Sequence, residues 1–248
     1  MSSPQYITRL LTLCLLLQGC NGHQTYAPVI DGWQQGVKGL HQVQKGETVY
    51  SIAWSYGYDY RDIAAANNLQ SPYPIREGQK LRISKPNKNN KLEQKSRNNI
   101  YSGTKAKSVL SNHLSQTKVN SAIHWQWPVQ GPEISGYGFH PQQAPTGNKG
   151  IDFAGKEGAA VRAAAAGEVV YSGDGLASYG NLIIIKHSGE YLSAYAHNKK
   201  NWVEEGKHVE AGEKIAEMGS SGSHRVLLHF EIRHRGIPVD PHGYLPSK

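Results

Sequence analysis

Three short segments in the second half of the chain carry side chains that could bind a metal ion. They contain Asp152, His197 and His229. A catalytic zinc site usually offers three protein ligands, such as carboxylates and imidazoles, and leaves a fourth position for a water molecule whose pKa falls to about 7. Zinc-dependent hydrolysis is therefore the first chemistry that these residue types suggest.

The segments around these side chains resemble the lysostaphin/LytM type of zinc endopeptidase domain. In that family the zinc ligands are the first His and the Asp of a His-x-x-x-Asp motif, with the second His of a His-x-His motif. The order and spacing of several phrases carry the resemblance: Gly136-Tyr137-Gly138, Gly150-Ile151-Asp152-Phe153-Ala154, Gly180-Asn181-Leu182, Tyr195-Ala196-His197, Val209-Glu210-Ala211-Gly212-Glu213-Lys214-Ile215, Leu227-Leu228-His229-Phe230-Glu231 and Val239-Asp240-Pro241.

Two positions depart from the family pattern, because Asn148 and Leu227 stand where the family has histidines. By the same resemblance Asp152 and His229 match the remaining ligands, and His197 matches a histidine that helps to position water and stabilise the oxyanion. An amide is a poor zinc ligand. Leu227 shares a strand face with His229, since the two are two residues apart, but it cannot transfer a proton. We therefore expect no cofactor and no hydrolysis.

Alternative roles stay open for these side chains. Asp152 and His229 could form a hydrogen-bonded polar pair in a partly buried site, because buried polar groups need partners. His197 could be a structural donor at a strand end. His140 and His224 in flanking loops could replace the missing ligands, although neither fits the register of the family motif.

Residues 125–248 are expected to form a mainly antiparallel β domain. The stretches 168–171, 182–187, 191–196 and 227–233 are rich in β-branched and aromatic residues and are separated by glycine turns. No long helical period competes with them. The resemblance names the fold as the LytM, or duplicated hybrid motif, fold, in which strand faces line a groove and loops form its walls.

Residues 41–84 form a second unit with a predicted β-α-α-β order. Helices are expected at 51–56 and 59–67, with strand ends at Val43 and at Leu81 with Ile83. The segment resembles a LysM module, which binds the N-acetylglucosamine backbone of peptidoglycan. Tyr73 could offer its ring to the sugar or pack inward. The resemblance places the glycan between two loops, at Gly46, Glu47, Thr48, Val49, Pro72, Tyr73 and Ile75.

The first nineteen residues are predicted to be a lipoprotein signal peptide. Arg9 precedes an apolar run, 10–17, that is too short to cross a bilayer, and Gly19 and Cys20 follow. By resemblance to bacterial lipoproteins, Cys20 becomes the lipid-carrying N-terminus of a tether, 20–40, and Asn21 favours the outer membrane. An ordinary secretory signal is the alternative. The other of the 2 cysteines lies in the removed segment, so no internal disulfide is expected.

Residues 85–124 are predicted to be a flexible basic linker. The segment is rich in Lys, Asn, Ser and Gln and nearly lacks large apolar residues, so it cannot bury enough surface to fold. It carries much of the net charge of +8. It could touch anionic headgroups or wall carboxylates nonspecifically, or serve only as a spacer. Nucleic acid is not an expected partner, because the chain has an export signal and no nucleic-acid-binding motif.

This organisation resembles the NlpD-type murein hydrolase activators. The resemblance implies a noncatalytic lipoprotein, anchored in the outer membrane and facing the periplasm, that activates an N-acetylmuramoyl-L-alanine amidase during cell separation. The groove would bind the amidase's regulatory region and displace a blocking helix. A residual zinc-dependent peptidoglycan endopeptidase and a simple wall anchor are the alternatives. The groove floor is predicted at Tyr137, Asn148, Asp152, His197, Leu227 and His229.

Overall fold

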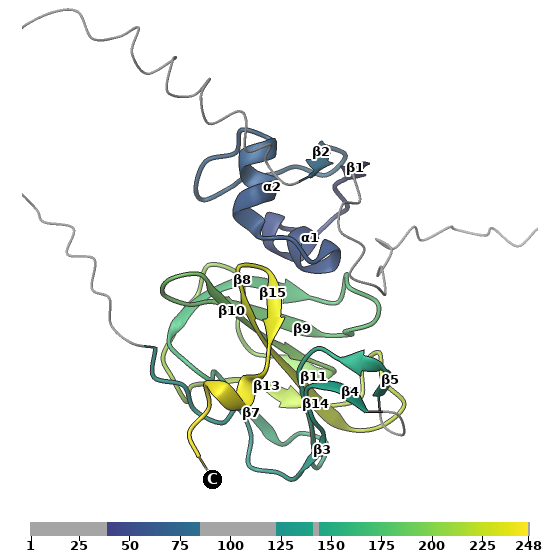
Figure 1. Ribbon diagram of the computed structural model, residues 1–248, viewed down its shortest axis with the longest axis vertical. Coiled ribbons are helices and arrows are strands. Elements are labelled where there is room, and N and C mark those ends of the chain that lie inside the picture. Colours follow the sequence, from purple (N-terminus) through teal and green to yellow (C-terminus); the bar gives the residue numbers. More distant parts are fainter. Residues whose placement is uncertain (1–38, 85–122, 141–143, 248) are drawn as a thin grey trace, which may run out of the picture.

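The computed structural model describes residues 39–84, 123–140 and 144–247, which form two domains (Figure 1). The predicted signal peptide, Cys20, the N-terminal tether and most of the predicted linker lie outside the described residues. None of the helices in the described ranges is long and apolar enough to cross a membrane. The two domains have the predicted classes, a small β-α-α-β unit and a mainly antiparallel β unit.

The small domain follows the predicted β-α-α-β order. Strands β1 (Gly39–Gln42) and β2 (Lys80–Ile83) pair antiparallel, and helices α1 (Val49–Tyr56) and α2 (Tyr60–Ala66) lie between them in the chain. Thr48 caps α1, since its hydroxyl accepts from Ser51 N (3.1 Å) and its own N–H donates to Ser51 Oγ (2.9 Å). Both predicted helices are confirmed within two residues at each end. The first strand ends one residue before Val43.

The large domain is built from antiparallel strands. Its main sheet has eight strands in the order β12-β8-β9-β10-β14-β6-β3, with β15 pairing with β14; a three-stranded sheet, β11-β13-β7, and the pair β4-β5 accompany it. The strands are β3 (Glu133–Ser135), β4 (Gly138–His140), β5 (Ala144–Asn148), β6 (Ile151–Ala154), β7 (Ala160–Arg162), β8 (Gly167–Gly173), β9 (Leu182–Lys186), β10 (Tyr191–Ala196), β11 (Asn198–Asn201), β12 (His208–Val209), β13 (Lys214–Met218), β14 (Leu227–His234) and β15 (Ile237–Val239), and a short 3-10 turn, η2 (Pro241–Gly243), follows.

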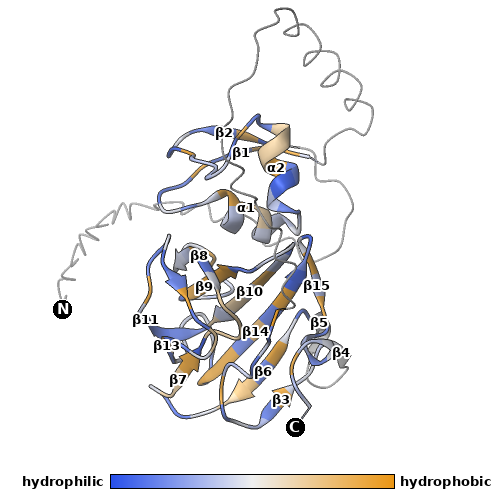
Figure 2. Ribbon diagram, turned by 90° about the vertical axis from the view of Figure 1, so that its left-hand side faces the viewer, coloured by the Kyte–Doolittle hydropathy of each residue, from blue (hydrophilic) through white to orange (hydrophobic). Residues whose placement is uncertain are grey.

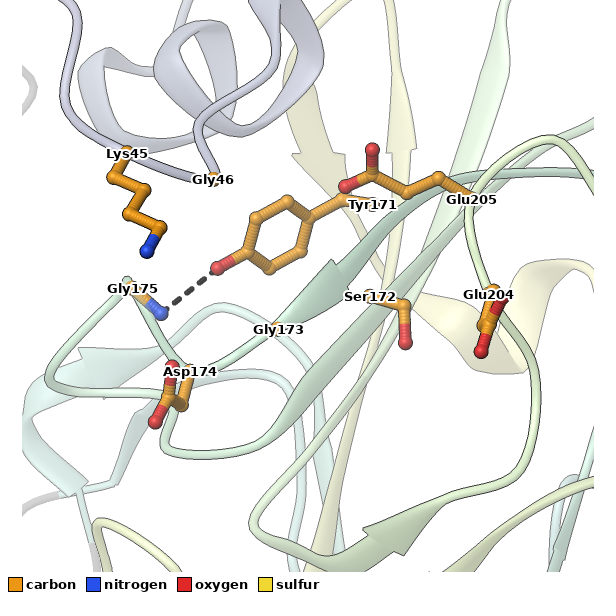
Figure 3. Close-up of a pocket in the computed structure, with 9 residues that line it drawn as sticks. All are labelled: Lys45, Gly46, Tyr171, Ser172, Gly173, Asp174, Gly175, Glu204 and Glu205. Atoms are coloured by element: carbon orange, nitrogen blue, oxygen red, sulfur yellow. Dashed lines mark hydrogen bonds between the residues drawn. The ribbon is translucent and has the colours of Figure 1, made fainter. Parts of the chain in front are cut away.

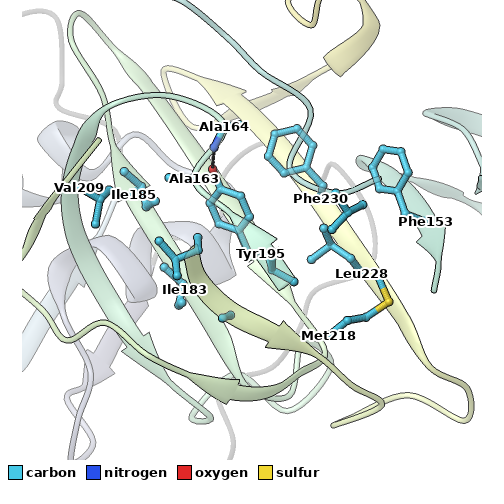
Figure 4. Close-up of a cluster of buried hydrophobic side chains, with 14 of the residues drawn as sticks. Phe153, Ala163, Ala164, Ile183, Ile185, Tyr195, Val209, Met218, Leu228 and Phe230 are labelled. Atoms are coloured by element: carbon cyan, nitrogen blue, oxygen red, sulfur yellow. Dashed lines mark hydrogen bonds between the residues drawn. The ribbon is translucent and has the colours of Figure 1, made fainter. Parts of the chain in front are cut away.

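The core of the large domain lies on one face of the main sheet (Figure 4). Phe153, Tyr195 and Phe230 are fully buried there. The Tyr195 hydroxyl accepts from the N–H of Ala164 (2.7 Å), so its polar end is satisfied inside the core. The four predicted strands correspond to β8, β9, β10 and β14, which confirms those predictions. Trp125 also packs against this core.

Strand β9 is apolar on both faces, and each face has its own partner. Ile183 and Ile185 point into the core, whereas Leu182 and Ile184 point to the opposite side, as the two-residue period of a strand requires. That opposite side is covered by the small domain. We call the shared apolar contact the interdomain cluster; it contains Tyr50, Trp54, Val170, Tyr171, Leu176, Tyr179, Leu182, Ile184, Leu192, Ala194 and Ala196.

The small domain sits on one side of the β domain with α1 nearest to it, and two views of the molecule agree on this (Figures 1 and 2). Tyr50 and Trp54 are its buried members of the interdomain cluster. Burial of apolar area is the main favourable term in such a contact, at about 25 cal/mol per Å². Packing of the two domains therefore explains why β9 has no polar face.

Candidate functional site

The predicted site residues meet where strands β6 and β14 run side by side. Asp152 and His229 are direct cross-strand partners in this antiparallel pair. Asn148 ends β5 and His197 follows β10, so neighbouring strands bring both toward the pair. Leu227 lies two residues before His229 on β14. We call Asn148, Asp152, His197, Leu227 and His229 the remnant site.

Both ring nitrogens of His229 contact carboxylates. Nδ1 lies 2.7 Å from Asp152 Oδ1, and Nε2 lies 3.1 Å from Glu231 Oε1. Carboxylates accept hydrogen bonds, so the arrangement is satisfied when the imidazole is protonated at both nitrogens. Burial opposes that charge, but the hydrogen bonds to Asp152 and Glu231 and their negative charges outweigh it and raise the pKa of His229 to about 9. His229 is therefore a cation at neutral pH.

The network continues along β14 beyond the predicted residues. Glu231 is fully buried, and its carboxylate accepts from Arg233 Nε (2.8 Å) and from the Tyr179 hydroxyl (2.8 Å). Burial alone would raise the pKa of Glu231, but the charges of Arg233 and His229 lower it to about 2. Arg233 also donates to the carbonyl oxygen of Trp54 in the small domain (2.8 Å). Charges of alternating sign thus run from Asp152 to the domain interface.

Sequence reasoning missed Glu231, Arg233 and Tyr179. The signal for two of them was present, since His229, Glu231 and Arg233 alternate along one strand and must share a face. Three ionisable residues on one face of a strand with buried neighbours predict an ion-pair network. Tyr179 lies in the segment between β8 and β9, and no local pattern indicates that it reaches Glu231.

Asn148 is almost buried and its side chain is fully engaged. Its amide nitrogen donates to Ser135 Oγ (3.1 Å) and to Asp152 Oδ2 (3.2 Å), while its amide oxygen accepts from the N–H of Gly150 (3.0 Å). Only 9% of the residue is exposed. Asn148 therefore holds β5 and β6 together and orients the Asp152 carboxylate toward His229.

The other predicted floor residues have different surroundings. Burial lowers the pKa of His197, and its neutral ring donates from Nδ1 to the carbonyl oxygen of Ser221 (2.8 Å), the structural role that one alternative assigned to it. Leu227 is 6% exposed. The Tyr137 hydroxyl donates to the carbonyl oxygen of Pro238 on β15 (3.1 Å). The structure thus brings together the five residues of the remnant site, whereas the hydroxyl of the sixth predicted floor residue, Tyr137, is directed toward β15.

The residues of the remnant site do not fit a zinc ion. Zinc needs a lone pair from each ligand, whereas both nitrogens of His229 lie within hydrogen-bond distance of carboxylates and the amide oxygen of Asn148 is a poor zinc ligand. Across residues 39–84, 123–140 and 144–247, no group of three His, Cys, Asp or Glu is placed to hold a metal. His224 is exposed, and the side chain of His140 lies outside the described part. The Asp152–His229 contact is the polar pair that one alternative predicted.

Three of the predicted glycan-binding residues, Gly46, Thr48 and Tyr73, lie toward the β domain. The Thr48 hydroxyl donates to the carbonyl oxygen of Val170 on β8 (3.1 Å). Tyr73 is half-buried, packs against the interdomain cluster and points edge-on toward Tyr50, with ring centroids 6.1 Å apart. Gly46 is exposed and lines a pocket that the two domains share. The remaining predicted residues range from exposed to buried: Pro72 is exposed, Glu47 and Ile75 are half-buried, and Val49 is buried.

Comparison with known proteins agrees with this two-domain organisation. Residues 41–84 match the LysM domain model, and residues 146–241 match peptidase family M23. Among solved structures, the catalytic domain of lysostaphin from Staphylococcus simulans is similar with a TM-score of 0.43 at 29% identity, covering 46% of this chain and 91% of that chain.

Several curated proteins are similar over most of the chain. Murein hydrolase activator NlpD of Escherichia coli is 38% identical, over 84% of this chain and 68% of that protein. Outer membrane antigenic lipoprotein B of Haemophilus influenzae is 37% identical, over 89% and 67%. The uncharacterized lipoprotein YgeR of Escherichia coli is 40% identical, over 98% and 93%. The chain therefore belongs to the NlpD-type lipoprotein family, as the resemblance of its motifs predicts.

Proposed function

We propose that this protein is a noncatalytic envelope lipoprotein that binds peptidoglycan and activates a periplasmic N-acetylmuramoyl-L-alanine amidase. The observation that carries the noncatalytic part is the pair of carboxylates on His229. Nδ1 lies on Asp152 and Nε2 on Glu231, so both nitrogens of the one histidine left from the family's zinc set are engaged by carboxylates. At the two positions that depart from the family pattern, Asn148 and Leu227 replace histidines.

The hydrogen-bonded state of the remnant site opposes zinc binding. With a pKa of about 9, removing the His229 proton at pH 7 costs about 3 kcal/mol, at 1.36 kcal/mol for each pH unit. Zinc would also have to replace the Asn148 contacts to Ser135 and Gly150. The bond from zinc to an Asn oxygen would be weak, because amide oxygens are better ligands for hard cations. This supports a binding role for the remnant site in place of hydrolysis.

Activation of a partner enzyme requires only a difference in affinity. A site that binds the open form of an amidase 1–3 kcal/mol more tightly than the closed form multiplies the ratio of open to closed amidase by about 5 to 150. The predicted contact surface is Tyr137 with the remnant site. Its His229 lies between two carboxylates, so it suits a polar peptide segment of complementary charge.

The LysM domain supplies the proposed wall attachment. The LysM match over residues 41–84 supports peptidoglycan binding, which we assign to the loops around Gly46 and Tyr73. The resemblance of the N-terminal segment to lipoprotein signals supports lipid attachment at Cys20, and relatives carry the name of lipoprotein. We therefore place the protein on the outer membrane, facing the periplasm.

A dye-release assay on labelled peptidoglycan tests the proposal. The arms are the protein alone, each candidate amidase alone and each mixture, with and without a zinc chelator in the protein-alone arm. The expected result is release only in a mixture with one or more amidases. Zinc-dependent release by the protein alone would show the endopeptidase alternative to be correct. No release in any mixture would contradict amidase activation and favour the third alternative, a simple wall anchor.

A further inference from the structure

Polar contacts at the starts of both LysM helices help to fix the LysM domain on the β domain. The Thr48 hydroxyl, at the start of α1, donates to the carbonyl oxygen of Val170 (3.1 Å). The Arg61 guanidinium, at the start of α2, donates to the Glu190 carboxylate (2.6 Å). The apolar cluster lies between them. Docking therefore combines apolar burial with directional contacts, and it has a defined geometry.

The docked LysM domain contacts the network that leads to the remnant site. The carbonyl oxygen of Trp54 accepts from Arg233 (2.8 Å), and the guanidinium carbon of Arg233 lies 3.6 Å from the centroid of the Trp54 ring. Arg233 in turn donates to the Tyr179 hydroxyl (3.2 Å). The Tyr179 ring lies 6.0 Å from that of His229. Undocking would remove the Trp54 contacts of both Arg233 and Tyr179 and leave them only their partners within the β domain, such as Glu231.

Residues 174–181 lie between the LysM domain and the remnant site. Leu176 and Tyr179 from this segment belong to the interdomain cluster, so docking holds both side chains. In this state the side chains of His229 and Asp152 are only 14% and 18% exposed. Tyr179, whose ring packs against Trp54 of the LysM domain, is one of the side chains beside His229, so docking holds part of the wall around these two residues.

The same docking restricts the glycan-binding loop. Gly46 opens into a pocket of about 420 Å³ between the domains, with Lys45 and Gly46 on one side and residues 171–175 of the β domain on the other (Figure 3). Three carboxylates line it, from Asp174, Glu204 and Glu205. A glycan strand at Gly46 would have to share this space with residues 171–175 of the β domain. The docked state therefore disfavours a glycan strand at Gly46.

We propose that the LysM domain acts as a clamp that peptidoglycan releases. Docked, it seats Thr48 on β8 and holds residues 174–181 against the remnant site. A glycan strand that occupies the LysM loops displaces β8, separates the domains and exposes the remnant site to the amidase. The clamp rests on the proposed function, because it assumes glycan binding by LysM and amidase binding by the remnant site.

This coupling has a measurable consequence. When docking and glycan binding exclude each other, the apparent Kd for glycan equals the intrinsic Kd divided by the undocked fraction. A variant that forces the domains apart therefore binds glycan more tightly. The same linkage requires that glycan binding shift the protein toward the undocked state.

One glycine allows the domains to be separated without touching the glycan loops or the remnant site. Gly236 lies in the turn between β14 and β15 with φ +76°, and a Cβ there would lie 2.4 Å from the backbone carbon and oxygen of Tyr58 in the LysM domain. Asparagine tolerates positive φ, so Gly236→Asn keeps the turn and pushes the LysM backbone away. Gly158 has φ +82° and nothing within 4 Å of an added Cβ, which makes Gly158→Asn the matched control.

The test measures binding of an N-acetylglucosamine pentamer to the full chain by titration calorimetry. We expect Gly236→Asn to bind about tenfold or more tightly than the unmodified protein and Gly158→Asn to bind as the unmodified protein does. Arg61→Gln, which removes the ion pair to Glu190, should also lower the Kd. It replaces Gly236→Asn in the test if that variant does not fold. Equal affinities in all folded proteins would overturn the clamp.

Hydrogen–deuterium exchange on the unmodified protein gives an independent readout. With saturating pentamer, the amides of residues 174–181 should exchange faster than without it. Unchanged exchange under saturation would overturn the clamp and leave glycan binding by LysM intact. Absence of pentamer binding by every protein would instead contradict the glycan part of the proposed function, and the clamp would fail with it.

Discussion

His229 Nδ1 lies 2.7 Å from Oδ1 of Asp152, its direct partner across strands β14 and β6. The pair sits where a zinc enzyme of this family would hold its metal, yet here each residue satisfies the other. Glu231 occupies the second nitrogen of the same ring. The chemistry of the remnant site therefore depends on one proton, the second proton of His229.

The variant Asn148→His should bind zinc with an affinity that rises with pH. It adds a third ligand beside Asp152 and His229, but zinc must displace the His229 proton, whose pKa is about 9. We expect the zinc affinity to be weak at pH 7 and to rise about tenfold for each pH unit up to pH 9, as one proton leaves for each ion bound. Competition with a fluorescent chelator at pH 7, 8 and 9 measures this. An affinity independent of pH would mean that His229 is neutral.

Stability should fall on the alkaline side. The folded pKa of His229 is raised above its unfolded value of 6.5, so its contribution is fully present below pH 6.5 and is lost as the pH rises through about 9. The loss is expected to be about 1–3 kcal/mol in the free energy of unfolding. Urea denaturation at pH 6.5 and 9.5 tests it. His229→Gln should show a flatter profile over this range, and parallel profiles would disprove the assignment.

The free energy of unfolding should also fall in acid, because His187 is buried in its neutral form. Burial lowers the pKa of His187 to about 4, while its Nδ1–H donates to the Ala166 carbonyl oxygen (2.8 Å). The unfolded chain takes up a proton at pH 6.5 and the folded chain does not, so stability is lost as the pH falls from 6.5 to about 4. Denaturation of His187→Asn over pH 7 to 4.5 should show a shallower loss by about 1–3 kcal/mol. The exposed His208→Asn should follow the unmodified protein.

Local patterns in the sequence were sufficient to predict much of the fold. β-branched runs such as Ile183 to Ile185 specify strands, whereas the predicted first helix began at residue 51 because the capping box of Thr48 with Ser51, which starts α1 at Val49, was not recognised. The motif around Asp152 and the one around His229 predicted a pair, because strand neighbours and a two-residue period determine which side chains meet. These features depend on residues close in the chain or on a known motif.

The interdomain contacts could not be predicted in the same way. The unbroken apolar run 182–185 indicates a strand buried on both faces, but it does not say what covers the second face. Trp54 and Arg233 meet across 179 positions of sequence. Such a contact depends on how two separately folded units pack, and neither unit carries a local signal for the other.

Removing Glu231 should destabilise the β domain strongly. Glu231→Ala leaves Arg233, which is 2% exposed, without its carboxylate and takes one partner from His229. An uncompensated buried charge costs about 3–5 kcal/mol, which urea denaturation resolves readily. Glu217→Ala, which breaks an exposed pair with Lys214, is the control and should leave stability nearly unchanged. Similar losses in both variants would contradict a buried network.

Gly150 should be irreplaceable for the geometry of the remnant site. A Cβ at this position would lie 2.0 Å from the carbonyl oxygen of Phe230 and 2.9 Å from Glu231 Cγ, so Gly150→Ala must push β6 away from β14. We expect a loss of about 2–4 kcal/mol and a fall in the pKa of His229 toward its ordinary value, because Asp152 moves out of hydrogen-bond range. An NMR titration of the His229 ring follows the second effect. Gly243→Ala meets nothing within 4 Å and should change neither quantity; an unshifted His229 pKa in Gly150→Ala would show that Asp152 does not hold the proton.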